Sequence, residues 1–177
     1  MAAKKFVEQL NNQIGNEFAA HQQYVACATY YDTLTMPRLA AFFYRQALEE
    51  RDHAMMMVQY LLDADASVEI PGVAAPTSKF KDIVAPVTLA LEQEKRVTDQ
   101  VNGLTALARS QNDFASDQFM QWFIKEQVEE VATVSTLLTV VERAGDNLFH
   151  IEDFMAREMA RAASTDTTAP KAAGGAV

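Results

Sequence analysis

Residues 48–57 have the sequence LEERDHAMMM, which is typical of a helix interior but contains an unbroken run of polar and charged side chains from Glu49 to His53. Alternating steps of four and three residues mark the side of a helix that faces a core. Counted in this way, one line along the helix consists of Leu39, Phe43, Gln46, Glu50, His53, Met57 and Tyr60. The sequence therefore predicts a carboxylate and an imidazole inside a hydrophobic core.

Three other long stretches of the chain show the same feature. The same count gives the lines Leu10, Ile14, Glu17, His21, Tyr24, Ala28 and Tyr31; Val87, Leu91, Glu94, Thr98 and Val101; and Met120, Phe123, Gln127, Glu130, Val134, Leu137 and Val141. Each line contains a carboxylate near the middle of its helix. We therefore expect four acids to meet at one depth.

The positions of proline, glycine and polar clusters divide the chain into helices. We expect long helices over 5–33, 37–64, 86–111 and 114–143, and a short one over 146–158 with Asp146 as candidate N-cap. At 1.5 Å per residue the long helices span roughly 40 Å each. Two short joins and one long crossover over 63–86 predict an all-α four-helix bundle. We expect a bundle domain over 1–161 and a disordered tail over 162–177.

The composition restricts the class of partner. Of 177 residues, 24 are acidic and 15 basic, so the net charge of −9 disfavours nucleic acid and anionic membranes and favours cations. The chain shows neither a signal peptide nor a long apolar span, which predicts a soluble, cytoplasmic protein. Cys27 is the single cysteine, so it has no partner for a disulfide or a zinc motif and we assign it no role.

Buried carboxylates need a neutralising partner. An uncompensated buried charge costs several kcal/mol, whereas a whole domain is typically stable by only about 5 to 15 kcal/mol. The core lines contain no lysine or arginine beside the acids, and protonating all four would leave crowded acids without a purpose. Carboxylates with one imidazole suit a pair of Fe(II) or Mn(II) ions better than zinc or calcium. We therefore predict a two-metal site.

Each part of this pattern is weak when taken alone. Glu50-x-x-His53 is more often an ordinary helix pair, and Glu17 or Glu94 alone is more often solvated. Gln127 and Glu130 also suit a polar belt on a partly exposed face. Because all four helices carry an inward-facing carboxylate at matching depth, the combined pattern favours a metal site over these separate explanations.

Four stretches together resemble bacterial non-haem ferritins, from about Phe6 to Arg157. They are NEFAAHQQY (16–24), LEERDHAMMM (48–57), LALEQEKRVTDQV (89–101) and FMQWFIKEQVEEV (119–131). The resemblance implies the ferritin-like up-down-down-up bundle with a short fifth helix. It also implies iron storage and detoxification, with Fe(II) oxidised by O2 or H2O2 and the ferric product kept inside a hollow shell of 24 chains.

The resemblance also assigns ligands to these iron ions. Glu17, Glu50 and His53 would hold one iron; Glu50, Glu94 and Glu130 would hold the second, with Gln127 beside the pair. A third iron site would use Glu49, Glu126, Glu129 and Glu130. Tyr24 lies on the same face as Glu17 and would bond a carboxylate ligand or give an electron to oxidised iron, although a structural core tyrosine fits equally well.

The fourth helix departs from the symmetric di-iron pattern. Such bundles use Glu-x-x-His twice, but here Gln127-x-x-Glu130 supplies no second histidine, so we expect the second iron to be held more loosely. Bacterioferritins place a haem-ligating methionine between the Glu and His of the first motif. Arg51 and Asp52 stand there in this chain, so we expect no haem by that route.

Two rival functions stay open on the sequence alone. A di-iron oxidase or peroxidase acting on another substrate would use the same ligands without forming a mineral. A purely structural bundle would use the polar core for specificity and would bind no iron.

Overall fold

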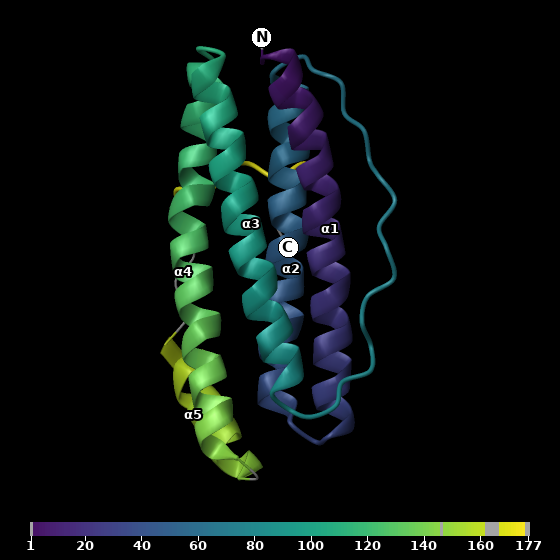
Figure 1. The fold of residues 1–177 in the computed structure, drawn as a ribbon, viewed down its shortest axis with the longest axis vertical. Coiled ribbons are helices and arrows are strands. Elements are labelled where there is room, and N and C mark those ends of the chain that lie inside the picture. The colour runs from purple at the N-terminus through teal and green to yellow at the C-terminus, as the bar shows by residue number, and fades with distance from the viewer. Residues whose placement is uncertain (1, 146, 162–166, 176–177) are drawn as a thin grey trace.

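The computed structural model describes residues 2–145, 147–161 and 167–175, and these residues form helices and irregular segments without a β-strand. The four long helices are α1 (Lys4–Thr33), α2 (Pro37–Asp63), α3 (Ala85–Ser110) and α4 (Phe114–Ala144), and α5 (Leu148–Arg161) is shorter (Figure 1). The all-α bundle is confirmed, with each long helix ending within one residue of its predicted bounds. The fifth helix begins later and ends later than predicted, and Asp146 lies outside the described residues.

The chain runs along the bundle in the predicted order. The short join 34–36 makes α1 and α2 antiparallel neighbours, and the turn after α3 does the same for α3 and α4. Between these pairs, residues 64–84 return along the whole length of α1, so that α2 and α3 point the same way (Figure 1). The up-down-down-up topology is therefore confirmed.

Polar side chains of α1 hold the irregular crossover in place. The Asn11 side chain accepts a hydrogen bond from the Glu69 backbone N–H (2.7 Å) and donates one to the Ser67 carbonyl (2.9 Å). Three turns later, Gln23 exchanges two bonds of 2.9 Å with the backbone of Thr77. Backbone groups that lack a helix or sheet partner are satisfied in this way.

Glycine allows the crossover to approach α1 closely. A Cβ atom at Gly15 would lie 2.5 Å from Cγ of Pro71, which is closer than two carbon atoms can pack. The side chain of Tyr31 then anchors the far end, where its hydroxyl donates to the Ile83 carbonyl at 2.6 Å. These contacts fix the crossover against the outer face of α1.

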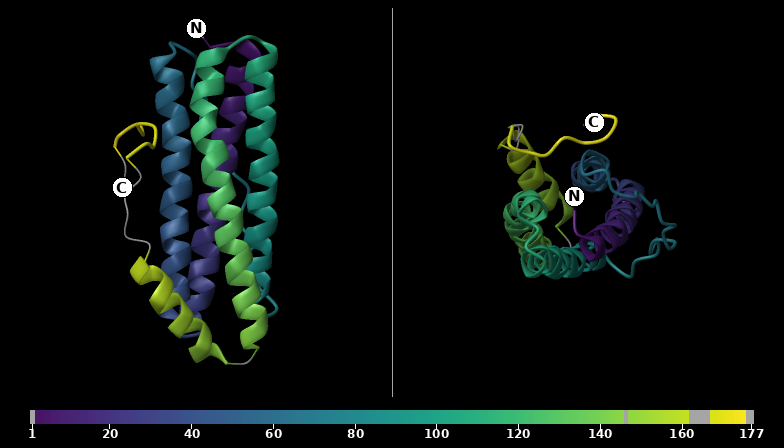
Figure 2. Two further views of the ribbon diagram at one scale, coloured as in Figure 1. Left: turned by 90° about the vertical axis from the view of Figure 1, so that its left-hand side faces the viewer. Right: turned by 90° about the horizontal axis from the view of Figure 1, so that it is seen from above.

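The short helix α5 lies across the end of the bundle (Figure 2). Its Ile151 and Met155 side chains are buried in the core. Its Glu152 carboxylate accepts bonds of 3.0 Å from the backbone N–H groups of Arg38 and Leu39, in the first turn of α2. An acid at this end of a helix satisfies free donors and complements the helix dipole.

Replacing Glu152 with glutamine should weaken the docking of α5. The amide keeps the shape of the side chain but loses the charge and one acceptor, so we expect a loss of about 1 to 2 kcal/mol. Urea denaturation of the assembled protein measures this loss, with exposed Glu142→Gln as the control. Equal midpoints for the two variants would contradict a capping role for Glu152.

The hydrophobic core is divided into two clusters. One cluster packs around Tyr31, Phe43 and Val141, in the C-terminal halves of α1 and α4 and the N-terminal half of α2. The other cluster packs around Phe6, Leu61 and Met120, in the opposite halves of the same helices. On each long helix, the predicted ligand positions fall in sequence between the residues of the two clusters. The fold therefore places a polar band across the middle of the bundle.

Part of the chain after α5 lies against α2. The backbone N–H of Ala173 donates to the Met55 carbonyl at 3.0 Å, and Ala169 and Ala172 contact the second apolar cluster. Residues 162–166 and 176–177 lie outside the described residues, and the division into 1–161 and 162–177 stays a prediction. Among the described helices, none has the length and apolar character needed to cross a membrane.

Candidate metal centre

The four long helices bring six predicted ligand side chains into the polar band. Each exposes 5 % of its surface or less, and together they are Glu17 of α1, Glu50 and His53 of α2, Glu94 of α3, and Gln127 and Glu130 of α4. A buried charge is almost always paired or bound to a metal. The helical periodicity explains the position of each side chain, because each lies on the inward line of its helix.

Glu17, Glu50 and His53 form a compact group. One ligand atom from each lies within 4.8 Å of the others, and His53 Nδ1 lies 3.7 Å from Glu50 Oε2. Glu17 Oε2 and both carboxylate oxygens of Glu50 are buried without a hydrogen-bond partner. Buried polar atoms are rarely left unpaired, so these oxygens fit a cation that binds between them.

The remaining carboxylates are already hydrogen-bonded. The Tyr24 hydroxyl donates to Glu94 Oε1, and the Gln127 side-chain amide donates to Glu94 Oε2 at 3.4 Å. The side-chain amide of Gln46 donates to both oxygens of Glu130, at 3.2 and 3.0 Å. The two halves of the centre therefore differ. Glu17 and Glu50 have oxygens without a hydrogen-bond partner, whereas both oxygens of Glu94 and both of Glu130 accept hydrogen bonds.

Burial and mutual repulsion raise the pKa of three of these acids. Burial, followed by the charges of Glu94 and Glu17, raises the pKa of Glu50 well above its ordinary value. Burial also raises the pKa of Glu94 to about 7, and burial together with the Glu94 charge raises that of Glu130. A cation bound between these side chains would favour their deprotonated form and remove the repulsion.

The imidazole of His53 is kept neutral. Burial lowers the pKa of His53, which leaves a nitrogen lone pair available to a metal. The ring is held edge-on between Trp122 and Phe123, with ring centroids 5.5 and 5.8 Å away. Both aromatic side chains come from α4, so this helix orients the histidine of α2.

Sequence reasoning missed the amides that support the centre. Gln13, one turn before Glu17, exposes 2 % of its surface and donates to Glu17 Oε1 at 2.8 Å. Gln46 lies on the inward line of α2, but its bond to Glu130 depends on how α2 and α4 pack. The spacing of four residues between Gln13 and Glu17 is the one signal in the sequence that points to such a contact.

The acids predicted for a third site are brought together only in part. Burial, and then the charge of Glu126, raises the pKa of Glu49 to about 7, although the Glu49 side chain reaches solvent. The charges of Glu49 and Glu126 also raise the pKa of Glu130. Glu129, in contrast, is exposed and forms an ion pair with Lys125 at 3.7 Å.

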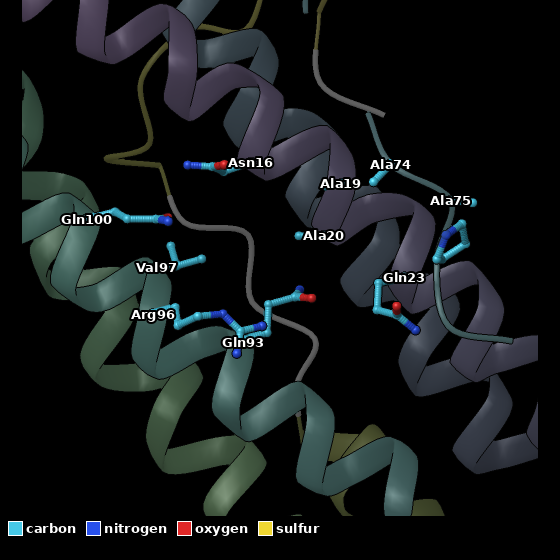
Figure 3. Close-up of a pocket in the computed structure, with 11 residues that line it drawn as sticks. Asn16, Ala19, Ala20, Gln23, Ala74, Ala75, Gln93, Arg96, Val97 and Gln100 are labelled. Atoms are coloured by element: carbon cyan, nitrogen blue, oxygen red, sulfur yellow. The ribbon is translucent and has the colours of Figure 1, made fainter. Parts of the chain in front are cut away.

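A pocket of about 260 Å³ lies between α1, α3 and the crossover (Figure 3). Its lining includes Asn16 and Gln93, the residues that precede Glu17 and Glu94 in the chain, and Gln100. Asn16 donates to the Gln13 amide oxygen at 3.0 Å, and Gln13 donates to Gln100 at 3.1 Å. A single buried amide, that of Gln13, thus connects the wall of the pocket to a predicted ligand.

Comparison with known proteins agrees with this geometry. A ferritin family model, described as the ferritin-like domain, matches residues 7–144. The chain belongs to the ferritin-like family.

Two ferritin sequences and one solved ferritin structure are similar to most of the chain. Ferritin BfrB of Mycolicibacterium smegmatis is 55% identical over 173 residues, which cover 98% of this chain and 95% of that protein. A bacterial non-heme ferritin of Staphylococcus aureus is 37% identical over 147 residues, covering 83% of this chain and 89% of that protein. A crystal structure of an open-pore ferritin from Archaeoglobus fulgidus superposes with a TM-score of 0.85 at 27% identity, covering 89% of this chain and 97% of that one. The predicted resemblance to bacterial non-haem ferritins is confirmed.

Proposed function

We propose that this protein stores iron and that it oxidises Fe(II) to Fe(III) at the buried centre. The observation that carries the proposal is the group formed by Glu17, Glu50 and His53, with three buried oxygen atoms that lack a partner. Hard carboxylate oxygens and one neutral imidazole suit iron better than zinc or calcium. The ferritin relatives support the same assignment.

The side chains would perform this reaction by holding two Fe(II) ions and favouring their loss of electrons. Glu17, Glu50 and His53 would bind the first ion; Glu50, Glu94 and Glu130 would bind the second, beside Gln127. Anionic oxygen ligands stabilise Fe(III) more than Fe(II). Each ion would give one electron, so that two ions together reduce O2 to H2O2 or H2O2 to water, and hydrolysis of the ferric product would release protons.

Tyr24 has a supporting role in this proposal. Its buried hydroxyl donates to Glu94, and burial, followed by the charge of Glu94, keeps its pKa well above the ordinary value. The phenol therefore stays protonated and orients the Glu94 carboxylate toward the centre. The same position would allow it to give an electron to oxidised iron.

The ferric oxyhydroxide needs a container to stay soluble. We propose a closed shell of 24 copies in the cytoplasm, with α5 at the symmetry axes, as the resemblance implies. The net charge of −9 per chain would draw Fe(II) toward such a shell. Because Arg51 and Asp52 occupy the interval inside the first motif and pair with each other at 3.0 Å, we propose no haem ligand there.

Aerobic addition of Fe(II) to metal-free protein tests this function. Ferric absorbance should rise quickly, and the iron should elute with protein at the size of a large shell. Glu17→Gln removes a ligand and should leave slow oxidation with iron precipitating outside, whereas Glu142→Gln should behave like the unmodified protein. Fast oxidation without retained iron would favour an oxidase acting on another substrate, and equal slow rates in all three proteins would favour a structural bundle.

A third binding position near Glu49 and Glu126 gives a separate prediction. Glu126→Gln should reduce the iron bound per chain from three ions to two without slowing the first oxidation, because Glu126 lies outside the six buried ligands. Anaerobic Fe(II) titration followed by stopped-flow absorbance measures both quantities. Exposed Glu142→Gln makes the same chemical change away from the site and is the control, and unchanged iron binding in Glu126→Gln would contradict the third site.

A further inference from the structure

The contact between Gln46 and Glu130 is unusual among the bonds of the centre. Both side chains are buried, with 7 % and 5 % of their surfaces exposed, and one amide nitrogen donates to both carboxylate oxygens at 3.2 and 3.0 Å. An atom that contacts both oxygens of one carboxylate stands where a chelated cation would stand. The Gln46 amide therefore occupies the position on Glu130 that a metal chelated by this carboxylate would use.

Gln13 provides an internal comparison. Its amide also donates to a predicted ligand, but to Glu17 Oε1 alone, at 2.8 Å, and Glu17 Oε2 stays without a partner. Its remaining contacts, with Asn16 and Gln100, hold the amide in place. Gln13 thus bonds one oxygen of Glu17 and leaves the other available to a cation. Gln46, in contrast, donates to both oxygens of Glu130.

We propose that Gln46 is a positioning residue that holds Glu130 closed in the metal-free protein, so that the second metal position fills only by displacing this amide. The inference rests on the proposed function, since it concerns the same centre. Glu94, the other acid of this half, is also hydrogen-bonded at both oxygens, by Tyr24 and Gln127. The first position, with its three unpartnered oxygens, is ready for a cation without such a rearrangement.

The consequence is an ordered filling of the centre. A metal chelated by Glu130 needs the two hydrogen bonds from Gln46 to be broken, and the cost of breaking them lowers the affinity of the second position. A single ion would therefore bind at Glu17, Glu50 and His53 before a second one binds.

Anaerobic titration with Co(II) tests the role of Gln46, because Co(II) is not oxidised under these conditions and its visible absorption reports each binding step. We expect two steps in the assembled, unmodified protein. Gln46→Met removes the donor with little change in volume, and the second step should move to Co(II) concentrations at least about tenfold lower while the first stays in place. Gln46→Asn, whose amide is too short to reach Glu130, should behave like Gln46→Met if the methionine variant does not assemble.

Gln13→Met is the matched control, because it removes an amide donor from the other half of the centre. Its first step should weaken and its second should stay in place. A second step that is unmoved or weakened in Gln46→Met, or tightened equally in Gln13→Met, would overturn the inference. Absence of any Co(II) binding by the unmodified protein would instead overturn the proposed function, so the two failures are distinguishable.

Discussion

Replacing Glu50 with glutamine should abolish rapid Fe(II) oxidation and at the same time stabilise the metal-free protein. Glu50 is the ligand proposed for both iron ions, and the loss of even a supporting group costs 10- to 100-fold in many metal sites, so we expect a rate loss above about 100-fold. In the metal-free protein, however, both Glu50 oxygens are buried without a partner. Because burial raises the pKa of Glu50, folding at neutral pH either buries its charge or takes up a proton, and a neutral amide avoids both costs. Glu50→Gln should therefore raise stability by about 1 to 3 kcal/mol.

Stopped-flow ferric absorbance and thermal unfolding of the metal-free protein measure the two effects on the same samples. Exposed Glu142→Gln makes the same chemical change outside the centre and should alter neither quantity. A Glu50→Gln protein that loses both activity and stability would indicate that the carboxylate holds the bundle together. That result would favour a structural role for the polar band.

The metal-free protein should become less stable as the pH rises from about 4.5 to 7. Folding raises the pKa of Glu94 from its ordinary value of 4.5 to about 7, and it raises the pKa of Glu50 and Glu130 as well. Between the unfolded and folded pKa values, the folded chain binds more protons than the unfolded chain. The contribution of these acids to the free energy of unfolding is therefore fully present below about pH 4.5. It is lost as the pH rises through the folded pKa, by on the order of 3 kcal/mol for Glu94 alone.

Bound metal should reverse this dependence. Cations bind the deprotonated carboxylates, so the added stability of Co(II)-loaded protein should grow over the same pH range as protons are released. Urea midpoints at several pH values, with and without Co(II), measure the two trends. Glu94→Gln should flatten the metal-free curve; a curve of unchanged slope in that variant would contradict the assignment of the raised pKa to the buried centre.

The helical periodicity predicted most of this structure because one rule applies along each long helix. The steps of four and three residues identified Glu17, Glu50, Glu94 and Glu130 as inward-facing, and all four are buried. His21 was placed on the same line but is only half-buried, and its Nδ1 contacts the Ala47 carbonyl at 2.6 Å instead of the centre. His21 is the middle member of its line, and Glu17 and Tyr24 on either side of it are buried, so the periodic count alone does not decide how far a single polar side chain is exposed.

Contacts that depend on the packing of two elements could not be predicted. Gln46 meets Glu130 only when α2 and α4 are aligned in depth, and Glu152 reaches the start of α2 only after α5 folds back. The partners of Asn11 and Gln23 are backbone groups in an irregular segment, which no periodic pattern reveals. The inward-facing acids were therefore predictable from single helices, whereas the amides of Gln13 and Gln46 that bond two of them were not.

The anchors of the crossover set how far its length can vary among relatives. Asn11 and Gln23 are separated by about 18 Å along α1, at 1.5 Å for each helical residue, and they hold Glu69 and Thr77. The segment from Glu69 to Thr77 reaches roughly 26 Å when extended. Deleting one or two residues between these anchors would still let the chain span the gap, whereas deleting three would pull an anchor off the helix. Variation in length should therefore accumulate outside this segment, and insertions within it should form outward bulges that leave the metal ligands in register.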